Sequence, residues 1–313
     1  MKSRKKMTVN QMVLIALAAW MRENYGSTMI QALRTVLPIQ EKIKAKEKKY
    51  ICLDISEEAG MQLLKELEQT RFKARTRLLR ELLEKKRLDY THAAKELGTT
   101  SAVVKKFQEQ GIIRIEYDEI MRTSLNTGDI SGERQMPLTD EQEAAVKQIQ
   151  REWKNPSPKP VLIEGVTGSG KTQVYIKLIE QTLSQGKEAI VLIPEIALTY
   201  QTVRRFYARF GDKVSVINSR QSQGERYDQF KRAKKGEVQV MIGPRSALFT
   251  PFASLGLIII DEEHEPSYKS ESTPRYHARE TAIRRAVLEH ANVVMGSATP
   301  SVEAYSKAMN GEY

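Results

Sequence analysis

The sequence has a single cysteine, Cys52, among its 313 residues. One cysteine cannot form an internal disulfide or a thiolate metal cluster, which excludes a disulfide-stapled secreted domain and suits a reducing cytoplasm. Long hydrophobic runs are also missing. The apolar run Met12–Met21 has ten residues, whereas a membrane-spanning helix needs about 20. We therefore expect a cytoplasmic protein without a membrane segment.

The same apolar run follows the basic segment Met1–Lys6 and so imitates a secretory signal. No small-x-small cleavage site comes after it, and its residues are strong helix formers, so a buried helix is the better prediction. Residues 8–36 are expected to form two helices broken near Gly26-Ser27, and residues 40–50 a charged connector.

Positive charge is in excess, with 50 Lys and Arg against 39 Asp and Glu and a net charge of +11. Such a balance favours an anionic partner but says nothing of the fold. Residues 1–50 hold 11 basic and 3 acidic side chains, and the segment 204–235 holds 10 and 3. The second segment is either a solvated helix face or a surface that tracks phosphates.

Helical spacing of leucines predicts a helix at Arg75–Lys86, followed by one at Thr91–Leu97 that ends at Gly98. A third helix is predicted from a cap among residues 99–101 to about Gln108, and a strand at Ile112–Tyr117. Helix, helix, turn, helix, strand is the winged-helix order. A small helical spacer or a protein-docking module is the alternative.

Residues 123–137 are rich in Gly, Ser, Thr and Asn and indicate a linker, after which short apolar runs alternate with helical segments. Such runs are typical of a parallel sheet covered on both faces, so we predict an α/β fold. The expected strands are Pro160–Glu164, Glu188–Ile193, Val214–Ile217, Val238–Ile242, Leu257–Asp261 and Asn292–Met295. The expected domains are residues 1–70 (helical segment and basic linker), 71–122 (winged-helix-like domain), 123–137 (linker) and 138–313 (α/β domain).

A phosphate-binding loop of the form G-x-x-x-x-G-K-[ST] follows the first of these strands and opens a helix. Its backbone N–H groups and the helix N-terminus suit phosphate oxygens. Lys171 is expected to reach the β and γ phosphates, and the Thr172 hydroxyl to ligate Mg²⁺. A glycine-rich turn without a ligand is the alternative. The loop comprises Gly165, Val166, Thr167, Gly168, Ser169, Gly170, Lys171 and Thr172.

A second motif, the acidic motif Asp261-Glu262-Glu263-His264, follows the buried strand at Leu257–Ile260. Ligands of parallel sheets lie beyond the carboxyl ends of strands, where Asp261 and Glu262 emerge. Asp261 can hold Mg²⁺ through water, and Glu262 can polarise an attacking water. Taken alone, this strand end could be an exposed loop or a metal site, and His264 a structural hydrogen-bonding group. The phosphate loop favours the nucleotide interpretation.

Together these residues resemble superfamily 2 helicases of the DEAH-like type, and within them the primosomal replication-restart helicases. The resemblance is strong over residues 138–313, which it identifies as a RecA-like first lobe, and weak before them. The matching segments follow the family's order: Leu138–Gln142, Gly165–Thr172, Leu192–Thr199, Ile242–Phe252, Leu257–Lys269, Pro274–Glu280 and Gly296–Ser301.

The resemblance implies roles for further residues. Gln142 is similar to the family's adenine-reading glutamine, and Ser297 and Thr299 to the motif that couples hydrolysis to DNA movement. Thr199 and Arg245 lie in segments that contact the DNA backbone in similar helicases, and His264 belongs with the DNA-binding or coupling residues. The family's aromatic-rich loop, which senses single-stranded DNA by stacking and phosphate pairing, is matched by Tyr268, Arg275, Tyr276, His277 and Arg279.

The implied activity is ATP-dependent 3′-to-5′ unwinding of DNA during primosome assembly at stalled forks, with ATP and Mg²⁺. Implied partners are branched or single-stranded DNA, other primosome proteins and single-stranded DNA-binding protein. The family also has a second lobe with an arginine finger, an amino-terminal domain that binds DNA 3′ ends, and a zinc-binding insertion. We find none of them here, and the chain has no zinc ligands.

We therefore expect a truncated chain that binds nucleotide weakly and hydrolyses it slowly or not at all by itself. The alternative is a non-catalytic DNA-binding or docking module with a vestigial nucleotide site. A P-loop enzyme that acts on a small substrate is a third reading, against which the full set of helicase motifs argues.

Overall fold

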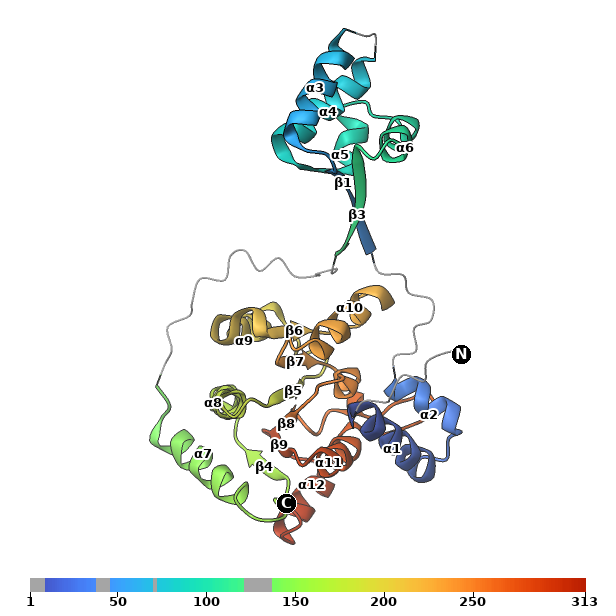
Figure 1. Cartoon of the computed structure of the whole chain (residues 1–313). Helices are drawn as coiled ribbons and strands as arrows, with labels where there is room; N and C mark the ends of the chain where they lie inside the picture. Colours follow the sequence, from blue (N-terminus) through green and yellow to red (C-terminus); the bar gives the residue numbers. More distant parts are fainter. Residues whose placement is uncertain (1–8, 38–45, 70–71, 121–136) are drawn as a thin grey trace. The chain divides into compact units, whose positions relative to one another are not determined.

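The computed structural model describes residues 9–37, 46–69, 72–120 and 137–313, and the chain divides into two compact units (Figure 1). The smaller unit is Lys44–Arg122, and the larger unit combines Met1–Ile43 with Thr123–Tyr313. The expected segment 1–70 is therefore split between the two units, which corrects its boundary. The expected linker 123–137 lies almost wholly outside the described residues.

The larger unit contains a six-stranded sheet in the order β4-β9-β8-β5-β7-β6, in which every pairing is parallel. Each of the six predicted apolar runs overlaps one of these strands, so the predicted α/β class is confirmed. The strands are β4 (Val161–Glu164), β5 (Glu188–Leu192), β6 (Val214–Val216), β7 (Val240–Gly243), β8 (Leu255–Asp261) and β9 (Asn292–Ser297).

Two hydrophobic cores cover the opposite faces of this sheet, because successive strand residues point to opposite sides. In β8, Leu257 and Ile259 belong to one core and Ile258 and Ile260 to the other. The first core includes α7 (Asp140–Glu152), α8 (Lys171–Ser184) and α9 (Tyr200–Phe210). The second includes α10 (Gln223–Lys234), α11 (Ala278–Glu289), α1 (Val9–Asn24) and α2 (Met29–Val36). Helix α12 (Val302–Met309) is the last helix of the described chain.

The predicted N-terminal helix pair is confirmed as α1 and α2, and α1 packs on α11 of the larger unit. Leu14, Leu17 and Met21 are buried in the second core. The apolar run that imitates a secretory signal is thus part of the core of the α/β unit. This packing explains why residues 9–37 group with the larger unit.

The smaller unit has a three-stranded antiparallel sheet in the order β2-β1-β3. Its strands are β1 (Lys46–Leu53), β2 (Arg87–Asp89) and β3 (Ile113–Ile120), and its helices are α3 (Glu57–Glu68), α4 (Lys73–Lys85), α5 (Tyr90–Lys95) and α6 (Ser101–Glu109). The elements α4, α5, α6 and β3 follow the predicted order. The winged-helix assignment itself stays a prediction.

Strand β1 corrects the sequence expectation, because part of the predicted charged connector 40–50 is its central strand. Ile51 is fully buried and pairs with Ile115 of β3, while Lys49 pairs with Tyr117. The strand was hidden because its lysines mask the alternation, and its partner is far away along the chain. Local patterns carry little information on such pairings.

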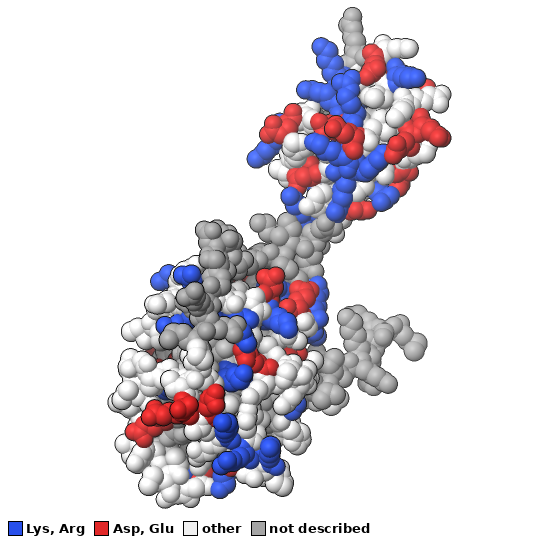
Figure 2. Space-filling view, turned by 90° about the vertical axis from the view of Figure 1, so that its left-hand side faces the viewer, with Lys and Arg blue, Asp and Glu red and all other residues white. Residues whose placement is uncertain are grey.

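The basic segment 204–235 does not form one face, because α9 and α10 lie on opposite sides of the sheet. Some of its charges are paired: Arg209 with Glu180, and Arg232 with Glu237 at 3.7 Å. On the side of the molecule shown in Figure 2, Lys and Arg are interspersed with Asp and Glu.

Candidate nucleotide-binding site

The phosphate loop joins β4 to α8 at the carboxyl end of the sheet. Gly170 caps α8 in the left-handed region at φ 84°, and Gly168 has φ 85°. Residues other than glycine are strained in this conformation because of their Cβ atom. A Cβ on Gly170 would also lie 2.2 Å from Nε2 of Gln142. The loop conformation therefore needs both glycines, of which the motif G-x-x-x-x-G-K-[ST] specifies Gly170.

Gln142 connects the start of α7 to the phosphate loop. Its Nε2 donates to the Ser169 carbonyl oxygen at 3.0 Å, and its Oε1 accepts from the Thr139 backbone N–H at 3.1 Å. The second bond is part of a capping box at the start of α7. The residue that resembles the adenine-reading glutamine thus lies against the loop. Its contact with adenine stays a prediction.

Lys171 and Thr172 occupy the first turn of α8, and both are half-buried. The ammonium of Lys171 donates to the Gly165 carbonyl oxygen at 2.6 Å, and the Gly165 N–H donates to the Ser297 carbonyl oxygen at 3.1 Å. The remaining loop residues Val166, Thr167 and Ser169 are exposed. The loop is thereby fixed to the end of β9, where the expected coupling motif Gly296-Ser297-Ala298-Thr299 (the GSAT motif) begins.

Asp261 ends β8, and its Oδ1 accepts a hydrogen bond from the Tyr175 hydroxyl at 3.0 Å. Burial raises the pKa of Asp261, the Tyr175 hydroxyl opposes that rise, and the Glu262 charge adds to it. Burial and the Asp261 charge raise the pKa of Tyr175 far above its usual value, so this hydroxyl remains a donor. Sequence reasoning missed Tyr175, although it lies four residues after Lys171 on the same helix face.

Glu262 has a positive φ of 47°, which is uncommon for a residue with a side chain. The carboxylate of Glu262 lies 3.7 Å from Nδ1 of His264, which contacts the Ser297 hydroxyl at 2.8 Å. The same Ser297 hydroxyl accepts from the Thr299 N–H at 3.0 Å. One contact chain therefore joins Glu262 through His264 to Ser297 and Thr299.

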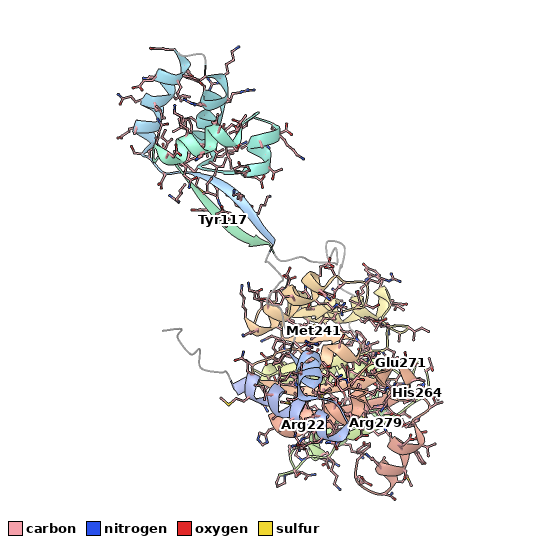
Figure 3. All side chains as sticks on the ribbon, turned by 90° about the vertical axis from the view of Figure 1, so that its right-hand side faces the viewer. Arg22, Tyr117, Met241, His264, Glu271 and Arg279 are labelled. Atoms are coloured by element: carbon pink, nitrogen blue, oxygen red, sulfur yellow. The ribbon has the colours of Figure 1, made fainter. Side chains whose placement is uncertain are left out.

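Glu263, to which the sequence assigned no role, is the buried centre of this region. The carboxylate accepts from Arg279 at 2.9 Å and from the N–H and hydroxyl of Ser301 at 2.6 and 3.1 Å. Glu263 and Arg279 are 1% and 6% exposed. The pair ties the acidic motif to α11 and to the segment after the GSAT motif. Arg279 of this pair and His264 of the acidic motif are labelled in Figure 3.

The structure corrects the expectation for the aromatic loop, because two of its rings are buried. Tyr268 is 1% exposed, and its hydroxyl lies 3.0 Å from the Leu192 carbonyl oxygen and 2.6 Å from that of Asp261. Tyr276 is 4% exposed and packs edge-on against Phe249. Rings enclosed in this way cannot stack on bases. Arg279 is likewise engaged with Glu263.

Arg245 contacts the same loop through two hydrogen bonds. Its Nη1 donates to the carbonyl oxygens of Ser267 and Lys269 at 2.7 and 2.8 Å. His277 caps α11 by accepting the Arg279 N–H on Nδ1 at 3.2 Å. Both side chains therefore have structural contacts. Their expected DNA contacts stay predictions.

Arg275 and Thr199 are the exposed residues among those expected to contact DNA, and Thr299 of the coupling motif is exposed as well. The Thr199 hydroxyl caps α9 by accepting the Thr202 N–H at 3.2 Å. Arg275 lies in the loop between the buried Pro274 and Tyr276. It is the arginine of the expected aromatic loop that remains exposed.

The residues of this site fit Mg²⁺ bound together with a nucleotide. Among the described side chains no group of three or more His, Cys, Asp or Glu could hold a metal ion. Mg²⁺ bound with nucleotide phosphates needs only one or two protein ligands. The Thr172 hydroxyl and the Asp261 carboxylate supply that number, at the end of the sheet where the Gly168 and Gly170 backbone suits phosphate oxygens.

The parallel α/β fold agrees with the class of DEAD/DEAH box helicase domains, and the sequence pattern of that family matches residues 139–308. The chain belongs to this family. Within it, the chain is 48% identical over 219 residues to "Replication restart protein PriA" of Bacillus subtilis (strain 168), across 70% of this chain and 27% of the relative. It is 36% identical over 310 residues to the protein of that name from Chlamydia muridarum (strain MoPn / Nigg), across 96% of this chain and 40% of the relative.

The chain thus spans between about a quarter and two fifths of the length of these relatives. A chain in the structure "Structure of RecG bound to three-way DNA junction" is similar at a TM-score of 0.42 and 24% identity, over 57% of this chain and 23% of the other. No helix in the described segments combines the length and apolar content needed to cross a bilayer.

Proposed function

We propose that this chain is the ATP-binding lobe of a DNA helicase that unwinds with 3′-to-5′ polarity during replication restart. The observation that carries the proposal is the contact network between the phosphate loop, the acidic motif and the GSAT motif. The Gly165 N–H donates a hydrogen bond to the Ser297 carbonyl oxygen, and the Ser297 hydroxyl contacts His264, whose ring lies next to the Glu262 carboxylate. Such a network joins a site of hydrolysis to the strand end that the family resemblance assigns to coupling.

Each group of the site has a distinct task in the proposal. The phosphate loop amides and Lys171 bind and orient the β and γ phosphates, which positions the substrate for in-line attack. Thr172 and Asp261 would hold Mg²⁺, which supplies neutralisation of phosphate charge when bound. Glu262 accepts the proton of the attacking water, and its position is set by the contact with His264.

The DNA side of the proposal rests on the family resemblance and on two exposed residues. Arg275 and Thr199 lie in the segments expected to contact DNA, and because both are exposed they can meet a DNA backbone without rearrangement of buried groups. Fork-like or single-stranded DNA is the proposed partner, together with primosome proteins and single-stranded DNA-binding protein. The relatives' name, replication restart protein, agrees with this role.

We also propose that these 313 residues, assayed by themselves, bind nucleotide but turn it over slowly. In the family an arginine finger from a second lobe acts on the transition state, and such a group supplies about 10³–10⁵ in rate. Fast DNA-stimulated ATP hydrolysis by the chain alone would refute this part.

A comparison of Lys171→Ala with Lys177→Ala tests the nucleotide site. Both lysines lie on α8, but Lys177 is exposed and pairs with Glu180 at 3.4 Å, away from the loop. We expect Lys171→Ala to abolish binding of a fluorescent ATP analogue and Lys177→Ala to keep it. Fork-DNA anisotropy is then measured with and without ATP. If ATP changes fork affinity in neither the wild type nor Lys171→Ala, the docking module with a vestigial site is the better function.

A further inference from the structure

Tyr175 is a buried polar residue of the site to which no role has been assigned so far. It lies four positions after Lys171 and three after Thr172, so all three side chains share one face of α8. The ring is 1% exposed, and the hydroxyl reaches across to Oδ1 of Asp261 at 3.0 Å. Tyr175 therefore connects the helix of the phosphate loop to the carboxylate at the end of β8.

Gly296 provides the space for this contact. It pairs with Ile163 of β4 on one side and with Asp261 of β8 on the other, in the strand that separates them. A Cβ at Gly296 would lie 1.7 Å from the Tyr175 hydroxyl oxygen and 2.9 Å from its Cζ. A side chain here must displace the tyrosine. The first residue of the GSAT motif thus admits the hydroxyl to Asp261.

We infer that Tyr175 is a positioning residue that fixes the orientation of the Asp261 carboxylate for Mg²⁺. The space for the Tyr175 hydroxyl exists because residue 296 is a glycine. The inference rests on the proposed function, in which Asp261 and Thr172 hold the ion. A ligand that is already oriented by a hydrogen bond loses less freedom on binding metal. Loss of such a supporting bond typically weakens metal affinity about 10–100-fold.

The test is a Mg²⁺ titration of the 313-residue chain with a fluorescent ATP analogue at fixed concentration. For Tyr175→Phe we expect the Mg²⁺ concentration at half-maximal binding to rise about tenfold. Binding of the metal-free nucleotide in EDTA should stay at the wild-type value, because Lys171 and the loop amides are unchanged. Electron paramagnetic resonance of added Mn²⁺ measures the metal itself and should show the same loss.

Tyr207→Phe is the matched control, since Tyr207 is a half-buried tyrosine of α9 in the same unit. Its Mg²⁺ midpoint should equal that of the wild type. A wild-type chain without Mg²⁺-dependent nucleotide binding would overturn the proposed function itself. A normal wild type with a Tyr175→Phe midpoint within twofold of it would overturn only the role of Tyr175.

Gly296→Ala gives an independent arm. If alanine acts by displacing the Tyr175 hydroxyl, Gly296→Ala should raise the Mg²⁺ midpoint in the Tyr175 background. It should add less than twofold to the midpoint of Tyr175→Phe, where the hydroxyl is already gone. Additive increases in the double variant would show that the two residues act separately and would overturn the inference.

Discussion

Replacement of Arg279 by alanine is expected to destabilise the larger unit strongly, because it leaves a buried carboxylate without its counter-ion. The Glu263 side chain is completely buried and that of Arg279 is 8% exposed, at a separation of 2.9 Å. Burial lowers the pKa of Arg279, but the bond and charge of Glu263 outweigh it and raise the pKa overall. Removing one partner of such a pair costs about 3–5 kcal/mol.

Part of this carboxylate's charge remains compensated in the variant, since the Ser301 N–H and hydroxyl still donate to Glu263. The lower end of the range, about 3 kcal/mol, is therefore the expected loss. For a unit of this size about 1 kcal/mol corresponds to 2–4 °C, so the melting temperature should fall by about 6–12 °C.

Urea unfolding followed by tryptophan fluorescence measures this loss selectively. Trp20 and Trp153 are the only tryptophans of the chain, and both belong to the larger unit. Arg275→Ala is the control, because this exposed arginine should change stability by less than about 0.5 kcal/mol. A second variant, Arg279→Met with Glu263→Gln, removes both charges and should be more stable than Arg279→Met alone. A loss below about 1 kcal/mol for Arg279→Ala would refute the reasoning.

Three further predictions concern single contacts. Arg245→Ala removes two bonds to carbonyl oxygens of the 266–269 turn and should cost about 1–3 kcal/mol and speed proteolysis of that turn; unchanged cleavage would contradict it. Thr139→Ala breaks the capping box with Gln142 and should cost about 1 kcal/mol in urea unfolding, whereas an unchanged midpoint would count against it. Burial and the Arg279 charge lower the pKa of His277, so the free energy of unfolding should fall as pH drops below about 6.5. His277→Gln should weaken this dependence of stability on pH, and an equal dependence in the variant would contradict the prediction.

Much of the α/β unit was predictable from its sequence because its signals are local. A buried parallel strand is a short apolar run, so all six strands could be placed within a few residues. The phosphate loop was equally evident, since Gly170 must adopt a left-handed conformation at the start of α8. The family membership followed from the order of such segments.

The smaller unit was less predictable because its sheet depends on distant pairing. Strand β1 reads as a charged connector until Ile51 is placed opposite Ile115. Helix α3 was not predicted either, although Ser56 caps it by accepting the Ala59 N–H at 3.3 Å. The domain boundary within residues 1–70 was wrong for the same reason: its two halves pack on different partners.

By itself, the sequence determined which residues form the phosphate loop, the strands and the acidic motif, because each of these depends on neighbours within a few positions. Only the tertiary structure decided what those residues touch. Tyr175 and Asp261 are 86 positions apart, and they meet because β9 lies between β4 and β8 with a glycine at the crossing point. The burial of Tyr268 and Tyr276 has the same origin: whether a ring is exposed depends on the elements packed around it, and strand order sets that packing.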